Sequence, residues 1–222
     1  DEAKKVGVVI EVNAETDFVA KNAEFQAFVD TCAKTVVEAN PADVDALNAC
    51  KAVGSEMTIS ELTTEKIQTI GENIKIRRFA RYEGAVATYI HAGGKIGVLV
   101  DVETDVVNDA IKEMAKNVAM QAAALKPLYT NDSEVDADYI AKEKEILTVA
   151  AKNEKPDAND KIISGMVMGR IKKELKEICL LDQVYVKAED GKQSVAQYVA
   201  QVAKENGAKI TVKKFVRFET GE

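Results

Sequence analysis

Two stretches of the chain carry the same order of apolar and polar positions, which indicates an internal repeat. Val6–Val12 followed by Thr16–Val19 is similar to Ile96–Val102 followed by Thr104–Val107, once a gap of two residues is allowed. Apolar residues at helical spacing follow each stretch. Each repeat is therefore predicted to run strand, turn, helix.

A second pair of similar segments closes each repeat. Residues 74–83, IKIRRFARYE, align without a gap with residues 210–219, ITVKKFVRFE. Both alternate between apolar and polar residues, as half-buried strands do. We expect the basic residues mostly on the outer face and helices on the other face. The helix-covered face of the first segment is predicted to hold Ile74, Ile76, Ala80 and Tyr82.

The repeats differ in length, which indicates an insertion. Asp17 and Ile74 are 57 positions apart, whereas Asp105 and Ile210 are 105 apart, so the second repeat has 48 additional residues. These residues carry two apolar stripes of helical period with a break at residues 153–157. Two helices joined by a short loop bury such stripes on each other, so we predict an inserted antiparallel helical hairpin.

The predicted fold class is α+β, with two repeated core subdomains of small antiparallel sheet packed on helices. The first subdomain covers residues 1–82, the second covers residues 83–129 and 181–222, and the inserted hairpin covers residues 130–180. A strand at residues 85–91, followed by a glycine turn, leads the second repeat. The first repeat has no counterpart of this strand, so we expect its sheet to be incomplete and an N-terminal segment to be missing.

Composition and charge exclude some classes of function. The chain has 222 residues, of which 46% are hydrophobic, and a net charge of -7. Nucleic-acid binding as the main task is disfavoured, because it depends on clustered Lys and Arg. No apolar run is long enough to span a bilayer, and no secretory leader is visible. We therefore expect a cytoplasmic protein whose partner is another protein.

Candidate chemistry for an enzyme is sparse. His91 is the one histidine, and no nucleophile–base motif, phosphate-binding glycine loop or complete calcium loop occurs. Cys32, Cys50 and Cys179 lack metal-ligand spacing, so we expect reduced packing residues. The sequence predicts no catalytic residue, no metal and no cofactor.

The turn at Thr16–Val19 is the main candidate for a binding site. Its Thr-Asp pair recurs in Thr104–Val107, so we expect the fold to form the same turn twice. The copy has Val106 in place of Phe18, which means that the fold alone does not require an aromatic residue there. Two interpretations of Phe18 stay open: it packs under the following helix as a hydrophobic staple, or it contacts a partner.

Three motifs, taken in order, resemble the elongation factor Ts family. They are residues 16–22 (TDFVAKN), residues 70–78 (IGENIKIRR) and residues 91–99 (HAGGKIGVL). The similarity continues to residues 215–219 and covers essentially the whole chain. In that family a small N-terminal helical domain precedes the matched region, and we expect this domain to be absent here.

The resemblance implies a non-catalytic guanine nucleotide exchange factor. Such a factor binds elongation factor Tu, in its GDP-bound and nucleotide-free forms, and promotes GDP release. Asp17 and Phe18 match the pair that inserts near the magnesium and phosphate site of Tu. The partner-binding residues implied by the resemblance are Thr16, Asp17, Phe18, Val19, Ile70 and His91.

Some alternatives stay open at this point. His91 ends a predicted strand before a glycine turn, so it has a second interpretation as a cap of that hairpin. An alternative interpretation is a nucleic-acid-binding stripe formed by Arg77, Arg78 and Arg81, which the negative net charge disfavours. The inserted hairpin resembles the family's dimerisation hairpin, so homodimer formation through this hairpin is a further alternative. We expect no direct contact with nucleic acid or with a membrane.

Overall fold

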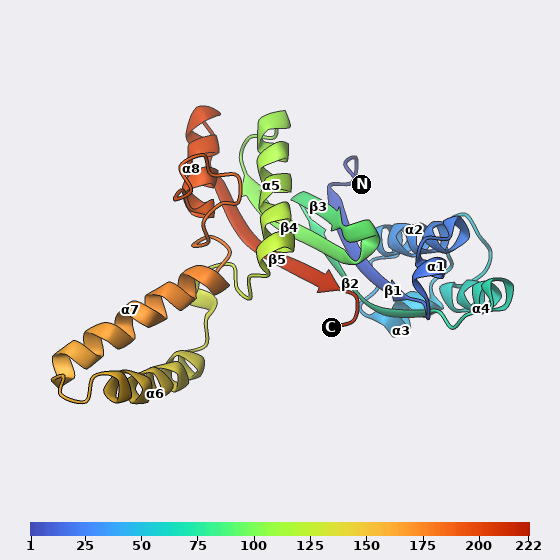
Figure 1. The fold of residues 1–222 in the computed structure, drawn as a ribbon. Coiled ribbons are helices and arrows are strands. Elements are labelled where there is room, and N and C mark those ends of the chain that lie inside the picture. The colour runs from blue at the N-terminus through green and yellow to red at the C-terminus, as the bar shows by residue number, and fades with distance from the viewer. The chain divides into compact units, whose positions relative to one another are not determined.

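The computed structural model describes all 222 residues, which form two compact units. The sheet unit holds Asp1–Ala124 and Asn206–Glu222, and the helical unit holds Leu125–Glu205. Their helices and strands are labelled in Figure 1. None of the helices combines the length and the apolar character needed to cross a membrane.

The sheet unit contains two antiparallel sheets. Strand β1 (Val6–Asn13) pairs with β2 (Lys75–Glu83) in the first sheet. The second sheet has β4 (Ile96–Thr104) in its centre, between β3 (Ala85–His91) and β5 (Ile210–Glu219). These small sheets and their helices confirm the predicted α+β class.

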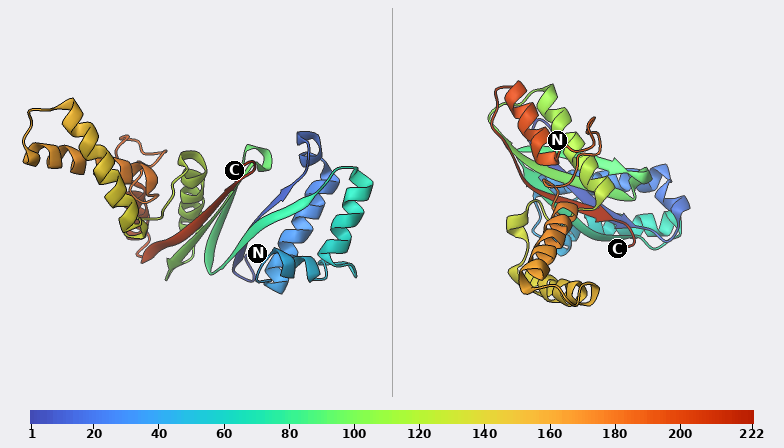
Figure 2. Two further views of the ribbon diagram at one scale, coloured as in Figure 1. Left: turned by 90° about the horizontal axis from the view of Figure 1, so that it is seen from below. Right: turned by 60° about the vertical axis from the view of Figure 1, so that its left-hand side comes forward.

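Helices cover the outer face of each sheet. On one side of β1 and β2 lie α2 (Ala23–Ala39), α3 (Val44–Ala49) and α4 (Ile59–Ile70), and the second sheet lies on the other side (Figure 2). The helix α5 (Asp109–Leu125) lies beyond the second sheet. The apolar side chains between the first sheet and its helices form one core, which includes Phe25, Phe28, Cys32, Val36, Leu47, Ile59, Ile74 and Ile76.

The two sheets pack face to face through glycines. A Cβ atom added at Gly7 would lie 2.7 Å from Leu99 Cδ1, and one added at Gly97 would lie 2.6 Å from Val9 Cγ2. Gly7 matches Gly97 in the repeat, and Val9 matches Leu99. The same close approach is thus made twice, because a residue without Cβ lets the backbones come this near.

A second pair of equivalent contacts crosses the same interface. The Arg78 guanidinium lies 4.3 Å from the centroid of the Phe218 ring, and the Lys214 ammonium lies 4.3 Å from that of Tyr82. Arg78 matches Lys214 in the repeat, and Tyr82 matches Phe218. The repeats therefore face each other as two halves of a pseudo-symmetric pair, joined by cation–π contacts.

The strands β2 and β5 each contain a β-bulge, so the predicted alternation of their side chains between the two faces is wrong in part. In β2 the bulge lies at Arg77, and in β5 it lies at the matching Lys213. A register shift of one residue moves the side chains beyond the bulge to the opposite face of the sheet. Ile76 consequently joins the helix-covered core, whereas Tyr82 faces the other sheet. The basic residue Arg78 also lies between the sheets and not on an outer face.

The interface between the sheets buries a carboxylate. Glu11 is 3% exposed and accepts hydrogen bonds from Arg77 Nη1 at 3.0 Å, from Arg78 Nε at 2.6 Å and from Asn13 Nδ2 at 3.1 Å. Burial by itself would raise the pKa of Glu11, but these hydrogen bonds outweigh it and hold the pKa below its ordinary value. Both arginines thus have partners within the chain, which disfavours their use as a nucleic-acid-binding stripe.

The three cysteines are free, as predicted for reduced residues. Cys32 and Cys179 are buried, and Cys50 is half-buried. Burial raises the pKa of the Cys32 thiol to about 12 and that of the Cys179 thiol to about 11. The two buried cysteines therefore stay protonated and pack as small apolar groups.

The helical unit contains α6 (Ala137–Glu154), α7 (Asp160–Ile178) and α8 (Val195–Glu205). The helices α6 and α7 fold back on each other (Figure 1) and enclose a small core of Ala151, Ile163, Val167 and Ile171. The assignment of this pair as an insertion into the second repeat stays a prediction, as does the division of the chain into three domains.

Candidate partner-binding site

The segment that follows β1 folds into a short helix, α1 (Asp17–Ala20). Thr16 has an extended backbone and is the N-cap, with its side-chain oxygen accepting a hydrogen bond from the backbone N–H of Val19 at 3.4 Å. Asp17 lies in the first turn, where the helix dipole favours negative charge. The Thr-Asp pair therefore starts a helix.

The neighbours Phe18 and Val19 have opposite environments. Val19 is 9% exposed and packs in the first core with Phe25 and Ile74. Phe18 is 88% exposed, so the interpretation as a hydrophobic staple is wrong. Val19 anchors α1, and the Phe18 ring is presented to the solvent with nearly its whole apolar surface uncovered.

The matching turn of the second repeat has a different structure. Thr104 is the last residue of β4, and the next helix begins at Asp109. Val106 is half-buried and Val107 is 60% exposed, which reverses the pattern of Phe18 and Val19. The prediction that the fold forms the same turn twice is therefore wrong.

Ile70 and His91 lie at the ends of their elements. Ile70 is the last residue of α4, is half-buried and packs against the first core. His91 ends β3 and is exposed, with its Nδ1 3.1 Å from the Tyr89 hydroxyl oxygen. The two rings stack with centroids 5.8 Å apart. The His91 side chain makes no capping hydrogen bond to the turn that follows, so no such bond supports its interpretation as a hairpin cap.

Two side chains outside the predicted set tie these segments to α1. Glu72, in the turn after α4, accepts a hydrogen bond from the backbone N–H of Thr16 at 3.0 Å. Lys95, in the turn before β4, has its Nζ 3.5 Å from Asp17 Oδ2. The sequence signal for both is their place inside the second and third motifs of the family resemblance. The structure thus links the three motifs around α1.

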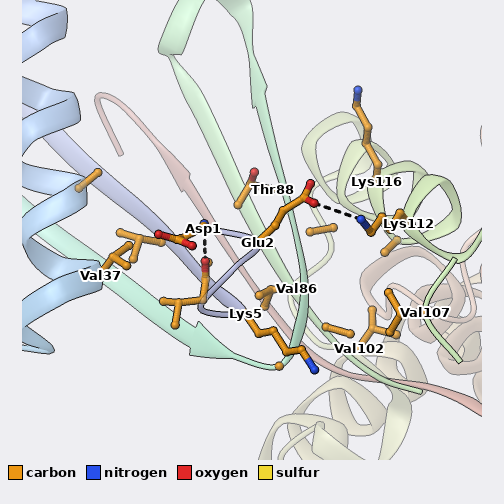
Figure 3. Close-up of a pocket in the computed structure, with 18 of the residues that line it drawn as sticks. Asp1, Glu2, Lys5, Val37, Val86, Thr88, Val102, Val107, Lys112 and Lys116 are labelled. Atoms are coloured by element: carbon orange, nitrogen blue, oxygen red, sulfur yellow. Dashed lines mark hydrogen bonds and ion pairs between the residues drawn. The ribbon is translucent and has the colours of Figure 1, made fainter. Parts of the chain in front are cut away.

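A separate cavity of about 940 Å³ lies in the sheet unit beside β1 (Figure 3). Its lining comes from β1, α2, β3 and α5 and includes the ion pair of Lys112 Nζ with Glu2 Oε2 at 3.1 Å. None of the predicted site residues lines this cavity. Its lining holds no histidine, cysteine or serine, and the chain has no group of three or more His, Cys, Asp or Glu side chains that could hold a metal ion.

An exposed aromatic ring beside a carboxylate on a capped helix is typical of surfaces that bind other proteins. Comparison with known families agrees with this class. The sequence model of the family described as Elongation factor TS matches residues 15–222. The chain belongs to the elongation factor Ts family, which confirms the resemblance and associates it with protein biosynthesis and nucleotide exchange.

Individual relatives support the same assignment. A protein of Clostridium botulinum (strain Eklund 17B / Type B) is 48% identical over 225 residues, which cover 100% of this chain and 72% of the relative. One from Syntrophotalea carbinolica is 47% identical over 97% of this chain and 71% of its own length. One from Clostridioides difficile (strain 630) is 47% identical over 98% of this chain and 71% of its own. All three carry the name Elongation factor Ts.

Proposed function

We propose that the chain is a guanine nucleotide exchange factor that binds elongation factor Tu and promotes the release of GDP. The observation that carries the proposal is the Phe18 ring, 88% exposed on a helix that Thr16 caps and Val19 anchors. Membership of the elongation factor Ts family supports the choice of partner and process. The chain acts by binding and catalyses no covalent step.

Exchange by binding is a linkage effect. A factor that binds the nucleotide-free partner more tightly than the GDP-bound partner must weaken GDP binding by the same coupling free energy. Such a factor needs no contact with the nucleotide itself. This fits a chain whose candidate site offers an apolar ring and a carboxylate but no phosphate-binding loop.

In the proposed mechanism, Asp17 and Phe18 insert near the magnesium and phosphate site of Tu. A fully buried Phe side chain contributes about 1.5–3 kcal/mol of hydrophobic free energy, which helps to hold partner helices apart. The Asp17 carboxylate, 74% exposed at its side chain, then changes the electrostatic surroundings of the magnesium ligands. Together they favour the nucleotide-free partner.

The remaining candidate residues support this insertion. Thr16 and Val19 hold α1 in place, one by capping and one by packing. Ile70 and His91 belong to the segments tied to α1 through Glu72 and Lys95, and we assign them flanking contacts with Tu. The cytoplasmic location and dimerisation through α6 and α7 stay predictions.

Stopped-flow fluorescence tests the proposal directly. Tu loaded with a fluorescent GDP is mixed with excess unlabelled GDP and increasing amounts of the chain. The chain is expected to accelerate GDP release, and Phe18→Ala is expected to lose most of that acceleration. Val53→Ala, which truncates an exposed apolar residue elsewhere in the same unit, is the matched control and should retain it.

Binding measured alongside release separates the outcomes. Tight binding of Tu without faster GDP release would replace exchange with an architectural role. Equal acceleration by the wild type and Phe18→Ala would overturn the assignment of Phe18. An absence of both binding and acceleration would overturn the choice of partner.

A further inference from the structure

One carboxylate accepts three hydrogen bonds from the two residues ahead of α1. Glu72 Oε2 accepts from the backbone N–H of Glu15 at 3.1 Å and from that of Thr16 at 3.0 Å. Glu72 Oε1 accepts from the Thr16 hydroxyl at 2.6 Å. Hydrogen bonds to an ionised acceptor are the stronger kind, so this cluster fixes the backbone where α1 begins.

The Thr16 hydroxyl connects this carboxylate to the helix itself. Its single hydrogen is donated to Glu72, and its oxygen accepts the N–H of Val19 inside α1. A reciprocal bond closes the loop, because Glu15 Oε1 accepts the backbone N–H of Asn73 at 3.2 Å. The start of α1 and the turn after α4 are thus bonded in both directions.

The second repeat shows what the chain does without this carboxylate. Ala208 stands at the position that matches Glu72, and its repeat forms no helix in the turn after Thr104. That turn is held differently, with Asp105 Oδ1 accepting the backbone N–H of Lys209 at 2.8 Å. The short helix therefore occurs in the repeat that has the glutamate and is missing from the repeat that lacks it.

We propose that Glu72 is a positioning residue that fixes α1 and thereby the direction in which Asp17 and Phe18 are presented; its consequence for exchange rests on the proposed function. A helix of four residues has too few internal hydrogen bonds to hold itself. Ordering it before the encounter lowers the entropic cost of binding. Because Glu72 lies two residues after Ile70, the same cluster also fixes α1 relative to the end of α4.

The free protein offers a test that does not depend on any partner. The chain contains no Trp, so Phe18→Trp places a single tryptophan at the exposed position, and this tryptophan can be excited selectively over the six tyrosines. Its time-resolved anisotropy should report slow tumbling of the whole unit. Adding Glu72→Ala should introduce a fast component of large amplitude, and Glu72→Gln, which keeps one acceptor oxygen, should give a smaller one. Glu56→Ala, which removes an exposed carboxylate paired with Lys51, is the control and should add none.

A double-mutant cycle tests the consequence for exchange. Glu72→Ala should slow GDP release at limiting factor concentration about tenfold, the effect expected when a hydrogen-bond acceptor with a charge is lost at a partly exposed position. In the Phe18→Ala background the same substitution should change the rate less than about twofold, because Glu72 acts by orienting α1 and the ring that makes the main contact is already absent.

Two results would overturn the inference. One is an unchanged anisotropy decay in the Glu72→Ala protein, and the other is an equal loss of exchange in both backgrounds, which would indicate general destabilisation. Failure of the proposed function looks different. In that case Phe18→Ala itself leaves GDP release unchanged, while the anisotropy of the free protein still decides whether Glu72 positions α1.

Discussion

The two repeats agree between their sheets and differ in the turn that follows their first strand. Between the sheets, matching residues make matching contacts, as Gly7 and Gly97 do with Leu99 and Val9. In the turn, the first repeat forms α1, whereas the second runs from β4 to α5 without a helix. The residues between the sheets are constrained because the sheet of each repeat must pack against the sheet of the other. The turn has no such constraint and can be specialised.

The specialised turn carries a feature that the fold does not need. Phe18 is 88% exposed, and the neighbouring Val19 already anchors α1 to the core beneath it. Exposing a large apolar ring gives up the free energy that its burial would contribute. The contrast between the repeats therefore separates residues that build the framework from Phe18, which we propose contacts the partner. Three substitutions test the framework residues.

The largest effect on stability is expected where the sheets approach most closely. Gly97→Val places branched carbon atoms against Val9 Cγ2, which lies only 2.6 Å from a Cβ at that position. Overpacking of this kind should lower the free energy of unfolding by about 3 kcal/mol, measured by urea denaturation. Gly169→Ala in α7, where nothing beyond the adjoining residues and the helix's own backbone lies within 4 Å of the added Cβ, should instead raise the free energy of unfolding by about 0.5–1 kcal/mol. A Gly97→Val protein of wild-type stability would contradict the face-to-face packing.

A smaller loss is expected from the buried carboxylate, and it should depend on pH. Glu11→Gln removes the charge that both Arg77 and Arg78 meet, so the free energy of unfolding at pH 7 should fall by about 2 kcal/mol. The folded-state pKa of Glu11 lies below its ordinary value of 4.5. The stabilisation is therefore complete above about pH 4.5 and disappears as the pH falls through the folded-state pKa.

Urea denaturation at several pH values checks this prediction. The wild type and Glu11→Gln should differ at neutral pH and converge in acid. Asp101, the matching residue of the second repeat, is half-buried, so Asp101→Asn is the control with the smaller expected loss. A difference between wild type and Glu11→Gln that stays constant down to pH 3 would show that the charge of Glu11 is not the stabilising feature.

The smallest effect is expected at the cation–π contacts. Lys214→Met keeps the aliphatic stem but removes the charge over the Tyr82 ring, and should lower the free energy of unfolding by about 0.5–1 kcal/mol. Lys213→Met at the bulge removes an exposed ion pair with Glu103, which solvent screens, so it should lower the free energy of unfolding less than Lys214→Met does. If Lys213→Met proved the more damaging of the two, the pseudo-symmetric contact would lose its assigned role.

The repeat comparison predicted the strands β1, β2, β4 and β5 and the helices α2 and α5, because their periodicity reflects which side chains are buried. It did not predict α3, α4 or α8. The comparison missed the bulges at Arg77 and Lys213. Both repeats have the extra residue at the same position, so their sequences align without a gap that would reveal it. The structure of the turn was missed for a different reason. Glu72 and Thr16 are 56 positions apart, and no local pattern shows that their side chains meet. Nor does a local pattern show which of Phe18 and Val19 is buried.

The central claim is that Phe18, and not a turn common to both repeats, carries the exchange activity. Phe18→Val gives the first repeat the residue that the second repeat carries at the aligned position. The most direct measurement is stopped-flow release of fluorescent GDP from Tu by the wild type and Phe18→Val at several magnesium concentrations. We predict at least about tenfold less acceleration by the variant, with a free energy of unfolding within about 0.5 kcal/mol of the wild type. Equal acceleration by the two proteins would contradict the account.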